Sequence, residues 1–574
     1  MKSLKFIFLL FIVSHSLFGQ FNRYAVYFTD KENSPYSINN PKALFTERAI
    51  QRRADQGIAI TCHDFPPNPS YVQSVAEMGA RVFYRSRWMN LVIVEATPEL
   101  IVDISNLPYV SGVDFAAPGS KLRSDNEEPG LEAWAPARLS GGGFKNTFQN
   151  EMMGTKDLPD TLKGQNMLIA VFDGGFSGVN TTAPFAHLYQ ENRIKYIHNY
   201  VENNKNVYQY SSHGTRALST MGAYLPAEFE GIAYKSEYIL SVTEDVPFRQ
   251  EHRIEEYNWL IAAEVADSLG VDIINTSLGY STFEMKCMDY SYEDLDGQTT
   301  LITRAAEMAS SKGILVVASA GNEGNDPWKY ITAPSDGRHV LAVGAIDSLL
   351  TKTPFSSIGP SPDNRTKPDV VALGARVKTI NNLGDIGISN GTSFAAPIVA
   401  GAAALYWQAN PQLNAYEVLR NLRLSGNMSE NPDNFYGYGI PNINFEPTIS
   451  LNIPEKSYGC GSFLQEPYYD FADCQLLSNI DILTVNNANE KGFSVYPNPV
   501  MKNMIYIQFY DHFDKENVNI NVFNLEGKTV FSKEIRDNTN NLLEIQLPEE
   551  IEKGHLVMIV DNFEESFQVK LLKL

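Results

Sequence analysis

The middle of the chain alternates between short, almost wholly apolar runs and longer segments in which apolar residues return at helical spacing. The short runs, which are typical of strands, are residues 166–173, 238–242, 272–277 and 314–319. The predicted helices between them are 253–269 and 299–312. In the first helix, one face carries the apolar positions Ile254, Tyr257, Ile261 and Val265, which indicates core rather than a cofactor site. This alternation predicts an α/β fold, a mostly parallel sheet with helices on both faces.

The segment before this region has a different pattern, β-α-β-β-α-β, across residues 21–118. The predicted elements are strand 24–28, helix 71–78, strands 81–84 and 91–95, helix 98–105 and strand 110–115. This order is that of a ferredoxin-like α+β unit. Residues 119–145 contain proline, acidic residues and three consecutive glycines, so we expect an exposed linker there.

The last part of the chain changes to short strands separated by turns. Residues 451–490 form an Asn-rich linker, and 491–574 contains strand-like runs at 493–499, 519–527 and 554–560. Strands of this length and spacing predict a small all-β sandwich.

Charge and the N-terminal residues narrow the class of protein. The formal net charge of −21 argues against a nucleic-acid partner and fits an exported protein. In residues 1–20, Lys2 and Lys5 precede the short apolar run 6–13, and small and polar residues follow it. This pattern predicts a secretory signal peptide, and a short membrane anchor is the other interpretation.

The chain has four cysteines, too few for disulfides to be the main source of stability. Cys460 and Cys474 lie close together in a polar stretch, and a local disulfide between them is one expectation. Cys62 lies in a segment that we expect to be removed, and Cys287 has no obvious partner.

Three polar side chains occupy positions suited to nucleophilic catalysis. Asp173 ends a predicted buried strand, at the edge where open α/β sheets place functional groups. His213 stands at the start of a predicted helix. The sequence Gly391-Thr-Ser-Phe-Ala-Ala-Pro397 can place Ser393 in the first turn of another helix, where Pro397 is tolerated. Free amide groups and the helix dipole favour developing negative charge at that position.

Two further strand ends add to this set. Asn322 follows the run 314–319, and its amide can donate a hydrogen bond to an oxyanion beside the backbone N–H of Ser393. The run 272–277 continues into Ser277-Leu278-Gly279, a segment suited to pairing with an extended peptide.

Over about residues 146–445 these segments resemble the subtilisin-like serine peptidases, in which Asp, His and Ser follow one another in this chain order. The resemblance implies that Asp173 orients His213, that His213 is the general base and then the acid, that Ser393 is the nucleophile and that Asn322 stabilises the oxyanion. It assigns the walls of the substrate cleft to Ser277, Leu278, Gly279, Ala320 and Gly321. No cofactor or metal is required for this chemistry, and 146–450 is the expected peptidase domain.

The chain departs from the family pattern at three positions near these residues. Gly174 stands where Ser or Thr is usual, Arg216 where a second His is usual, and Phe394 where Met is usual. None of the departures removes a group that carries the chemistry, but each bears on the fine geometry of the cleft.

The flanking regions carry weaker resemblances. Residues 21–118 are similar, by pattern and position, to the inhibitory propeptides of subtilisin-like enzymes, which makes 119–145 a processing linker; a permanent accessory domain is the alternative. The YPNP opening of 491–574, its Leu-Glu-Gly-Lys turn and its basic ending resemble type IX secretion sorting domains. That resemblance implies export through the periplasm by an outer-membrane secretion machinery, whereas a generic surface-binding sandwich is the alternative.

One insertion stays open to two interpretations. Between Ser281 and Gln298 the acidic residues are Asp289, Glu293, Asp294 and Asp296. Oxygen ligands of this kind could bind a structural calcium ion. A solvated loop beside the cleft is the interpretation we favour.

The sequence therefore predicts a secreted or cell-surface serine endopeptidase, made as a zymogen, that acts on proteins or peptides. A catalytically inactive surface-binding protein on the same scaffold is the alternative, and an acyl-transfer or ligation enzyme with the same three residues is a third.

Overall fold

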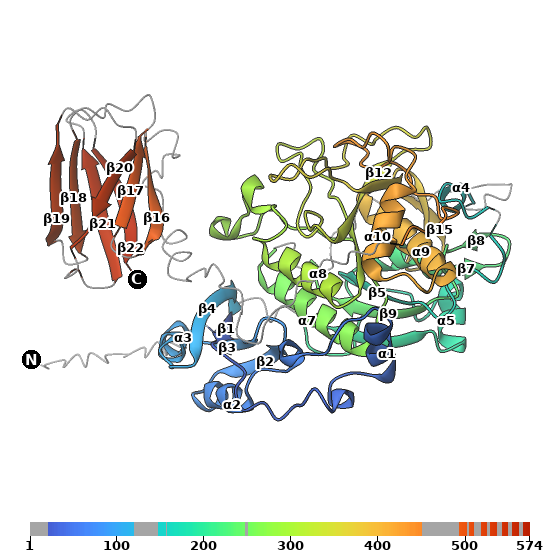
Figure 1. Cartoon of the computed structure of the whole chain (residues 1–574), viewed down its shortest axis with the longest axis horizontal. Coiled ribbons are helices and arrows are strands. Elements are labelled where there is room, and N and C mark those ends of the chain that lie inside the picture. Colours follow the sequence, from blue (N-terminus) through green and yellow to red (C-terminus); the bar gives the residue numbers. More distant parts are fainter. Residues whose placement is uncertain are drawn as a thin grey trace, which may run out of the picture. The chain divides into compact units, whose positions relative to one another are not determined.

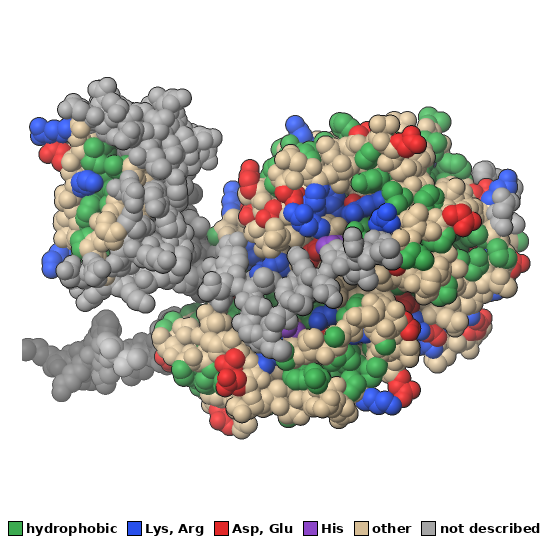
Figure 2. Space-filling model, viewed as in Figure 1, with side chains coloured by type: hydrophobic (Ala, Val, Ile, Leu, Met, Phe, Trp, Pro, Cys, Tyr) green, Lys and Arg blue, Asp and Glu red, His purple; other side chains and the backbone are tan. Residues whose placement is uncertain are grey.

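The computed structural model of the chain describes residues 21–119, 147–156, 158–246, 251–449, 493–501, 504–509, 518–524, 528–536, 542–548, 551, 554–561 and 566–573. It divides into two compact units, Met1–Gln475 and Leu476–Leu574 (Figure 1). The predicted signal peptide, nearly all of the predicted processing linker and the linker 451–490, with Cys460 and Cys474, lie outside the described residues. Figure 2 shows acidic and basic side chains interspersed with hydrophobic and polar ones over the visible face of the first unit.

The N-terminal domain (residues 21–119) contains an antiparallel sheet with the order β2-β3-β1-β4. Its elements are β1 (Asn22–Phe28), α2 (Pro69–Glu77), β2 (Arg81–Ser86), β3 (Leu91–Ala96), α3 (Pro98–Ser105) and β4 (Val110–Ala117). Both helices begin with a side-chain cap followed by proline: Asn68 accepts from Ser70 N, and Thr97 accepts from Leu100 N. The predicted ferredoxin-like order is therefore confirmed.

An arm that we did not predict joins β1 to α2. The arm (residues 29–68) contains α1 (Glu47–Asp55) and the short turns η1 (Pro41–Ala43) and η2 (Cys62–Asp64). The helix begins at Thr46, whose side chain accepts from Ala49 N. Its buried side chains are Ala49, Arg52 and Arg53. Because two of the three buried side chains are arginines, apolar periodicity does not indicate the helix.

The peptidase-like region (residues 147–449) is built on a seven-stranded sheet with the order β13-β12-β11-β10-β5-β9-β6. The strands are β5 (Leu168–Asp173), β6 (Ile194–Asn199), β9 (Glu237–Val242), β10 (Ile273–Thr276), β11 (Leu315–Ser319), β12 (Val340–Ile346) and β13 (Val370–Leu373). All neighbouring strands in the sheet are parallel, which agrees with the predicted mostly parallel sheet. Strands β6, β12 and β13 were not predicted.

Helices cover both faces of this sheet. The main ones are α6 (His213–Gly222), α7 (Ile254–Leu269), α8 (Leu301–Ser311), α9 (Thr392–Ala409) and α10 (Ala415–Leu424). In β5, Leu168, Ala170 and Phe172 join the core of α7 and α8, whereas Ile169 and Val171 join the core of α6 and α9. Successive side chains of a strand point to opposite faces, so a strand buried on both faces must be apolar throughout.

Smaller elements complete this region. They are α4 (Thr147–Glu151), η4 (Ala183–Phe185), α5 (Ala186–Gln190), β7 (Tyr224–Leu225), β8 (Phe229–Glu230), η6 (Lys286–Met288), η7 (Tyr292–Asp294), β14 (Val377–Ile380) and β15 (Ile386–Ser389). Among the described residues, no helix has the length and apolar composition needed to cross a membrane.

The second unit is all-β, as predicted. Its strands are β16 (Phe493–Met501), β17 (Met504–Phe509), β18 (Val518–Asn524), β19 (Thr529–Ile535), β20 (Leu542–Gln546), β21 (Gly554–Asp561) and β22 (Ser566–Lys573). The group β19-β18-β21-β22 joins the group β16-β17-β20 where Val500 pairs with Lys573. Apolar side chains of both groups, including Ile505, Ile520 and Ile545, share one core.

Candidate active site

The predicted catalytic residues lie at the carboxyl edge of the parallel sheet. Asp173 is the last residue of β5, and Asn322 follows β11. His213 is the first residue of α6, and Ser393 is the second residue of α9. The two helices pack against each other over the same face of the sheet, which places their first turns beside the strand ends.

Asp173 and His213 are in direct contact. His213 Nδ1 lies 2.9 Å from both carboxylate oxygens of Asp173, which is itself only 2% exposed. The amide of Gly174 donates to Asp173 Oδ1 at 2.8 Å and fixes the carboxylate further. Gly214 permits the close approach, because a Cβ there would lie 2.5 Å from Gly175 O and 2.9 Å from Asp173 Cβ.

Ser393 lies at the buried N-terminus of the long helix α9 and is 8% exposed. Gly391 leads into the helix with φ 144°, a backbone conformation that favours glycine. Ser393 Oγ donates to Ser277 O at 3.2 Å, and Ser277 Oγ donates to Ser393 O at 2.9 Å. The candidate nucleophile is thereby held against one predicted wall of the cleft.

The ring of Phe394 brings the serine and histidine segments together. Its centroid lies 5.3 Å from that of the His213 ring, with the ring planes inclined by 46°. The guanidinium of Arg216 lies 5.6 Å from the centroid of the same ring. Phe394 and Arg216, two departures from the family pattern, therefore form one packed group with the histidine.

The third departure, at Gly174, has a steric reason. A Cβ at this position would lie 2.1 Å from Val246 Cγ2. The loop after β9 fills the space that a Ser or Thr side chain would need. Glycine is therefore the residue that fits this packing.

The side chain of Asn322 is oriented by Thr392. Its Oδ1 accepts from Thr392 N at 2.9 Å and from Thr392 Oγ1 at 3.1 Å. Because the oxygen is held in this way, Nδ2 is the end of the amide that can donate to a ligand. Thr392 was missed by sequence reasoning, although its place beside Ser393 was a signal that could have been used.

The two predicted cleft walls are neighbours, and residues 332–333 connect them. Thr332 N donates to Ala320 O at 3.2 Å on one wall. Tyr280, which follows Gly279 on the other wall, exchanges two backbone hydrogen bonds with Ala333 at 2.9 and 3.0 Å. Thr332 Oγ1 would lie 2.1 Å from a Cβ at Gly279, so the side chain packs directly on that wall. No sequence motif pointed to Thr332.

A buried carboxylate, also missed from the sequence, lies close to Asp173. Glu244 follows β9, and its two oxygens each accept from Tyr280 Oη at 2.7 Å. Burial raises the pKa of Glu244 to about 8, and the charges of Glu251 and Asp173 raise it as well. Glu244 therefore stays mostly protonated at neutral pH.

The acidic insertion is more packed than we expected. Met288, Tyr290 and Leu295 are buried, whereas Glu293 is exposed and the three aspartates are half-buried, so the segment is only partly solvated. Its carboxylates bind nearby main-chain amides: Asp289 accepts from Phe283 N, Asp294 from Ser291 N, and Asp296 from Gln298 N and Thr299 N. Within the described ranges, no group of three or more His, Cys, Asp or Glu side chains is arranged to hold a metal ion.

The expectation for the cysteines is corrected at one position. The sequence shows no obvious partner for Cys287, but this cysteine is disulfide-bonded, and so is Cys62. The cysteines in the described part of the chain are thus both oxidised.

Family models match three successive parts of the chain. The subtilase family matches residues 164–439, a Bacteroidota peptidase S8 propeptide domain matches 23–129, and a secretion system C-terminal sorting domain matches 494–573. The propeptide and sorting domains indicate a protein that is secreted or displayed at the cell surface.

Individual proteins match the same central region. Subtilisin from Bacillus pumilus is 31% identical over 285 residues, which cover 49% of this chain and 90% of that protein. Subtilisin E from Bacillus subtilis is also 31% identical over 285 residues, but the match spans only 65% of its length. Among solved structures, MycP1 with its N-terminal propeptide removed aligns with a TM-score of 0.41 and 21% identity, covering 54% of this chain and 98% of that one.

The extent of the match to the Bacillus pumilus subtilisin, together with the family model over the region that carries Asp173, His213, Asn322 and Ser393, leads to one assignment. The chain belongs to the subtilase family.

Proposed function

We propose that the protein is a secreted serine endopeptidase that hydrolyses peptide bonds through Asp173, His213 and Ser393. The contact of 2.9 Å between His213 Nδ1 and the buried Asp173 carboxylate is the observation that carries this proposal. It supports a histidine whose Nδ1 bears the proton and whose Nε2 can accept one from a serine. The subtilase homology supports the same reaction class.

The reaction begins with attack of Ser393 Oγ on the scissile carbonyl carbon. The hydroxyl first turns from Ser277 O toward His213, which takes its proton as the C–O bond forms. His213 then gives the proton to the leaving amine, and an acyl-enzyme remains. Water attacks the acyl-enzyme with the same histidine as base, and the free acid is released. Asp173 keeps the imidazole oriented and stabilises its charged form.

The negative charge of the tetrahedral intermediate needs donors at fixed positions. Asn322 Nδ2 and the backbone N–H of Ser393 supply them, because Thr392 holds the Asn322 oxygen away from the oxyanion. An extended substrate pairs with the main chain of Ser277, Leu278 and Gly279, while Ala320 and Gly321 form the opposite wall.

The flanking domains determine when the enzyme becomes active and where it is exported. The N-terminal domain keeps the chain a zymogen until the chain is cut between residues 119 and 145. The C-terminal domain directs the folded protein to an outer-membrane secretion machinery.

A fluorophosphonate probe and a peptide library test the activity. The wild-type chain should react with the probe and cleave peptides, and Ser393→Ala should do neither and should remain unprocessed in purified form. Ser311→Ala is the matched control, because Ser311 ends α8 at the opposite edge of the sheet. A folded wild-type protein that the probe does not label would refute the proposal and favour the inactive surface-binding alternative. Transfer of the acyl group to an added amine in place of water would favour ligation.

A further inference from the structure

The arm of the N-terminal domain binds the edge of the sheet that lies opposite the candidate active site. Helix α1 contacts α7 and lies apart from the N-terminal sheet (Figure 1). Arg48 Nη2 bonds Asn166 O at 2.8 Å and Asp272 Oδ2 at 2.5 Å, just before β5 and β10 begin. Gln56 Nε2 bonds Gly313 O at 2.9 Å, just before β11 begins. The arm thus joins the amino ends of three parallel strands.

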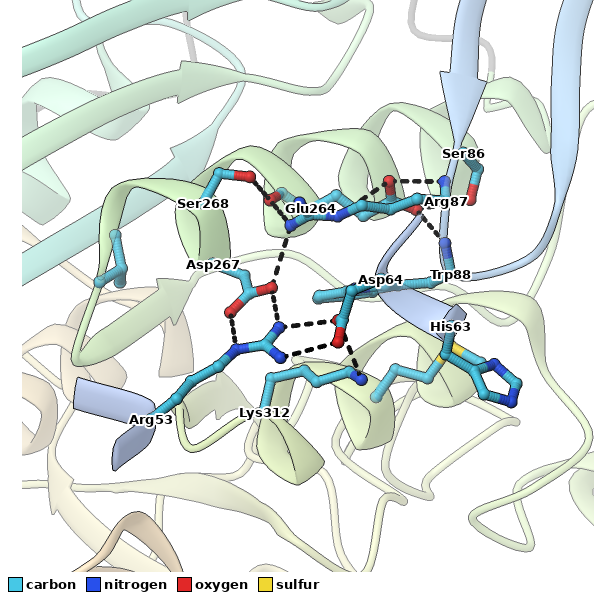
Figure 3. A network of polar contacts seen from close by, with 12 residues as sticks. Arg53, His63, Asp64, Ser86, Arg87, Trp88, Glu264, Asp267, Ser268 and Lys312 are labelled. Carbon is cyan, nitrogen blue, oxygen red and sulfur yellow. Dashed lines mark hydrogen bonds and ion pairs between the residues drawn. The ribbon is translucent and has the colours of Figure 1, made fainter. Parts of the chain in front are cut away.

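A buried ionic network strengthens this contact (Figure 3). From α7, Asp267 accepts from Arg53 Nη2 at 2.5 Å and from Arg52 Nη2 at 2.7 Å. Arg53 also forms a two-pronged pair with Asp64 of the arm, at 2.9 and 3.0 Å. Asp64 and Asp267 are fully buried, and the Arg53 side chain is 1% exposed.

The network continues to the turn between β2 and β3. Glu264, one helical turn before Asp267, accepts from Ser86 Oγ at 2.5 Å, Arg87 N at 2.9 Å and Trp88 N at 3.1 Å. Arg87 Nη2 reaches Asp267 at 2.9 Å. Across the interface, Lys312 at the end of α8 pairs with Asp64 at 3.1 Å.

The charges are divided between the partners in a complementary way. The N-terminal domain supplies three arginines to the network, and α7 supplies two carboxylates on one face. Asp64 offsets part of the positive charge within the N-terminal domain, and docking brings the remaining arginine charge against the two carboxylates of α7. Apolar residues of β1 and β3 share a continuous core with α7, so the interface is not held by charge alone.

A covalent bond adds to these contacts. Cys62, in the turn η2 next to Asp64, is disulfide-bonded. It is the only cysteine before residue 287, because the chain's other cysteines are Cys287, Cys460 and Cys474. Whichever of these is the partner, the bridge from Cys62 ends beyond residue 145. It therefore spans the segment in which processing is expected.

We propose that the N-terminal domain is a permanent part of the mature protein, held on the amino edge of the sheet by its arm and by the Cys62 bridge after the chain is cut. The cut belongs to the proposed function, whereas retention depends on the interface alone. A tethered domain rebinds intramolecularly at an effective concentration of roughly millimolar, so even a weakened interface stays closed. The oxidising conditions outside the cytoplasm preserve the bridge.

The test uses the full chain with a recognition site for a sequence-specific protease inserted between residues 119 and 145, in the Ser393→Ala background. Because the cut is made by the added protease, the result does not depend on whether the chain is a peptidase. Under denaturing conditions without reductant, the cut chain should keep its full mass, and reductant should release the N-terminal fragment. Release of the fragment without reductant overturns the covalent part of the proposal.

The arm is tested separately, in cut Cys62→Ser protein under native conditions. The fragment should still elute with the remainder in size-exclusion chromatography, and elution apart from it would overturn the role of the arm. Arg48→Ala should speed release of the fragment by up to about fivefold. Arg85→Ala, which removes an exposed arginine of the same domain, is the matched control and should leave the rate unchanged. Equal rates of fragment release for the two variants would also count against the proposal that the arm holds the domain in place.

Finally, the processed wild-type protein is purified after secretion and both chain ends are identified by mass spectrometry. The N-terminal fragment should be present in a one-to-one ratio with the catalytic fragment. Its absence would show that the domain is removed.

Discussion

The replacement Asp267→Asn removes the carboxylate on which the interface network converges. Asp267 accepts hydrogen bonds from Arg52, Arg53 and Arg87 at 2.5 to 2.9 Å and is fully buried. Burial by itself raises the pKa of Asp267, but the three guanidinium groups more than offset this effect, so the pKa lies below its ordinary value. The carboxylate therefore stabilises the folded state at neutral pH, and that contribution is lost as the pH falls through its lowered pKa.

The loss of folding stability expected for Asp267→Asn follows from the arginine charges that remain buried. Asparagine keeps one acceptor, but its amide nitrogen faces guanidinium donors and its charge is zero. Removing one partner of a buried ionic group costs about 3–5 kcal/mol. With about 2.1 cal/mol/K of unfolding entropy per residue and roughly 400 residues unfolding together, the melting temperature should fall by about 4–6 °C.

Thermal unfolding of the full chain, followed by circular dichroism in the Ser393→Ala background to prevent autolysis, measures this change. Asp103→Asn is the control, because Asp103 is exposed on α3. If the two variants melt within 1 °C of each other, the ionic network does not stabilise the interface and the reasoning is refuted.

Three further predictions address the site, the pH response and export. Asn322→Ala should lower kcat by roughly 10²–10³-fold with KM nearly unchanged, because its donor acts on charge that appears in the transition state; a raised KM with normal kcat in steady-state assays would contradict this role. The pKa of Glu244 is about 8 in the folded protein against an ordinary 4.5, so the folded state retains a proton that the unfolded state loses. Stability should therefore decline between about pH 5 and pH 8, by up to ~1.4 kcal/mol per pH unit, and urea titrations of Glu244→Gln should show a flatter profile. Truncation before Lys491 should leave a folded, maturing enzyme inside the producing cell, because the C-terminal unit forms its own compact body; normal amounts in the medium on immunoblots would refute the sorting role.

The sequence by itself determined the features that depend on local order along the chain. Wholly apolar runs predicted strands that are buried on both faces. Asp173 is the last residue of one of these strands, and Asn322 follows another. His213 and Ser393 could be placed at helix starts because flanking glycine and small residues mark those turns. The helix Pro98–Ser105 was predicted with its observed bounds, since its cap and proline are adjacent in sequence.

Only the tertiary structure decided how distant segments meet. Arg53 and Asp267 are separated by 214 positions in the sequence. An arginine-rich helix is expected to be exposed to solvent unless the carboxylates that pair with it are known. The sequence alone likewise does not reveal the contact of Phe394 with His213, the protonated Glu244 beside Asp173 or the oxidised state of Cys62. Local sequence patterns indicate which faces are apolar. Whether a charged side chain can be buried depends on the opposite charges that a distant part of the chain places next to it.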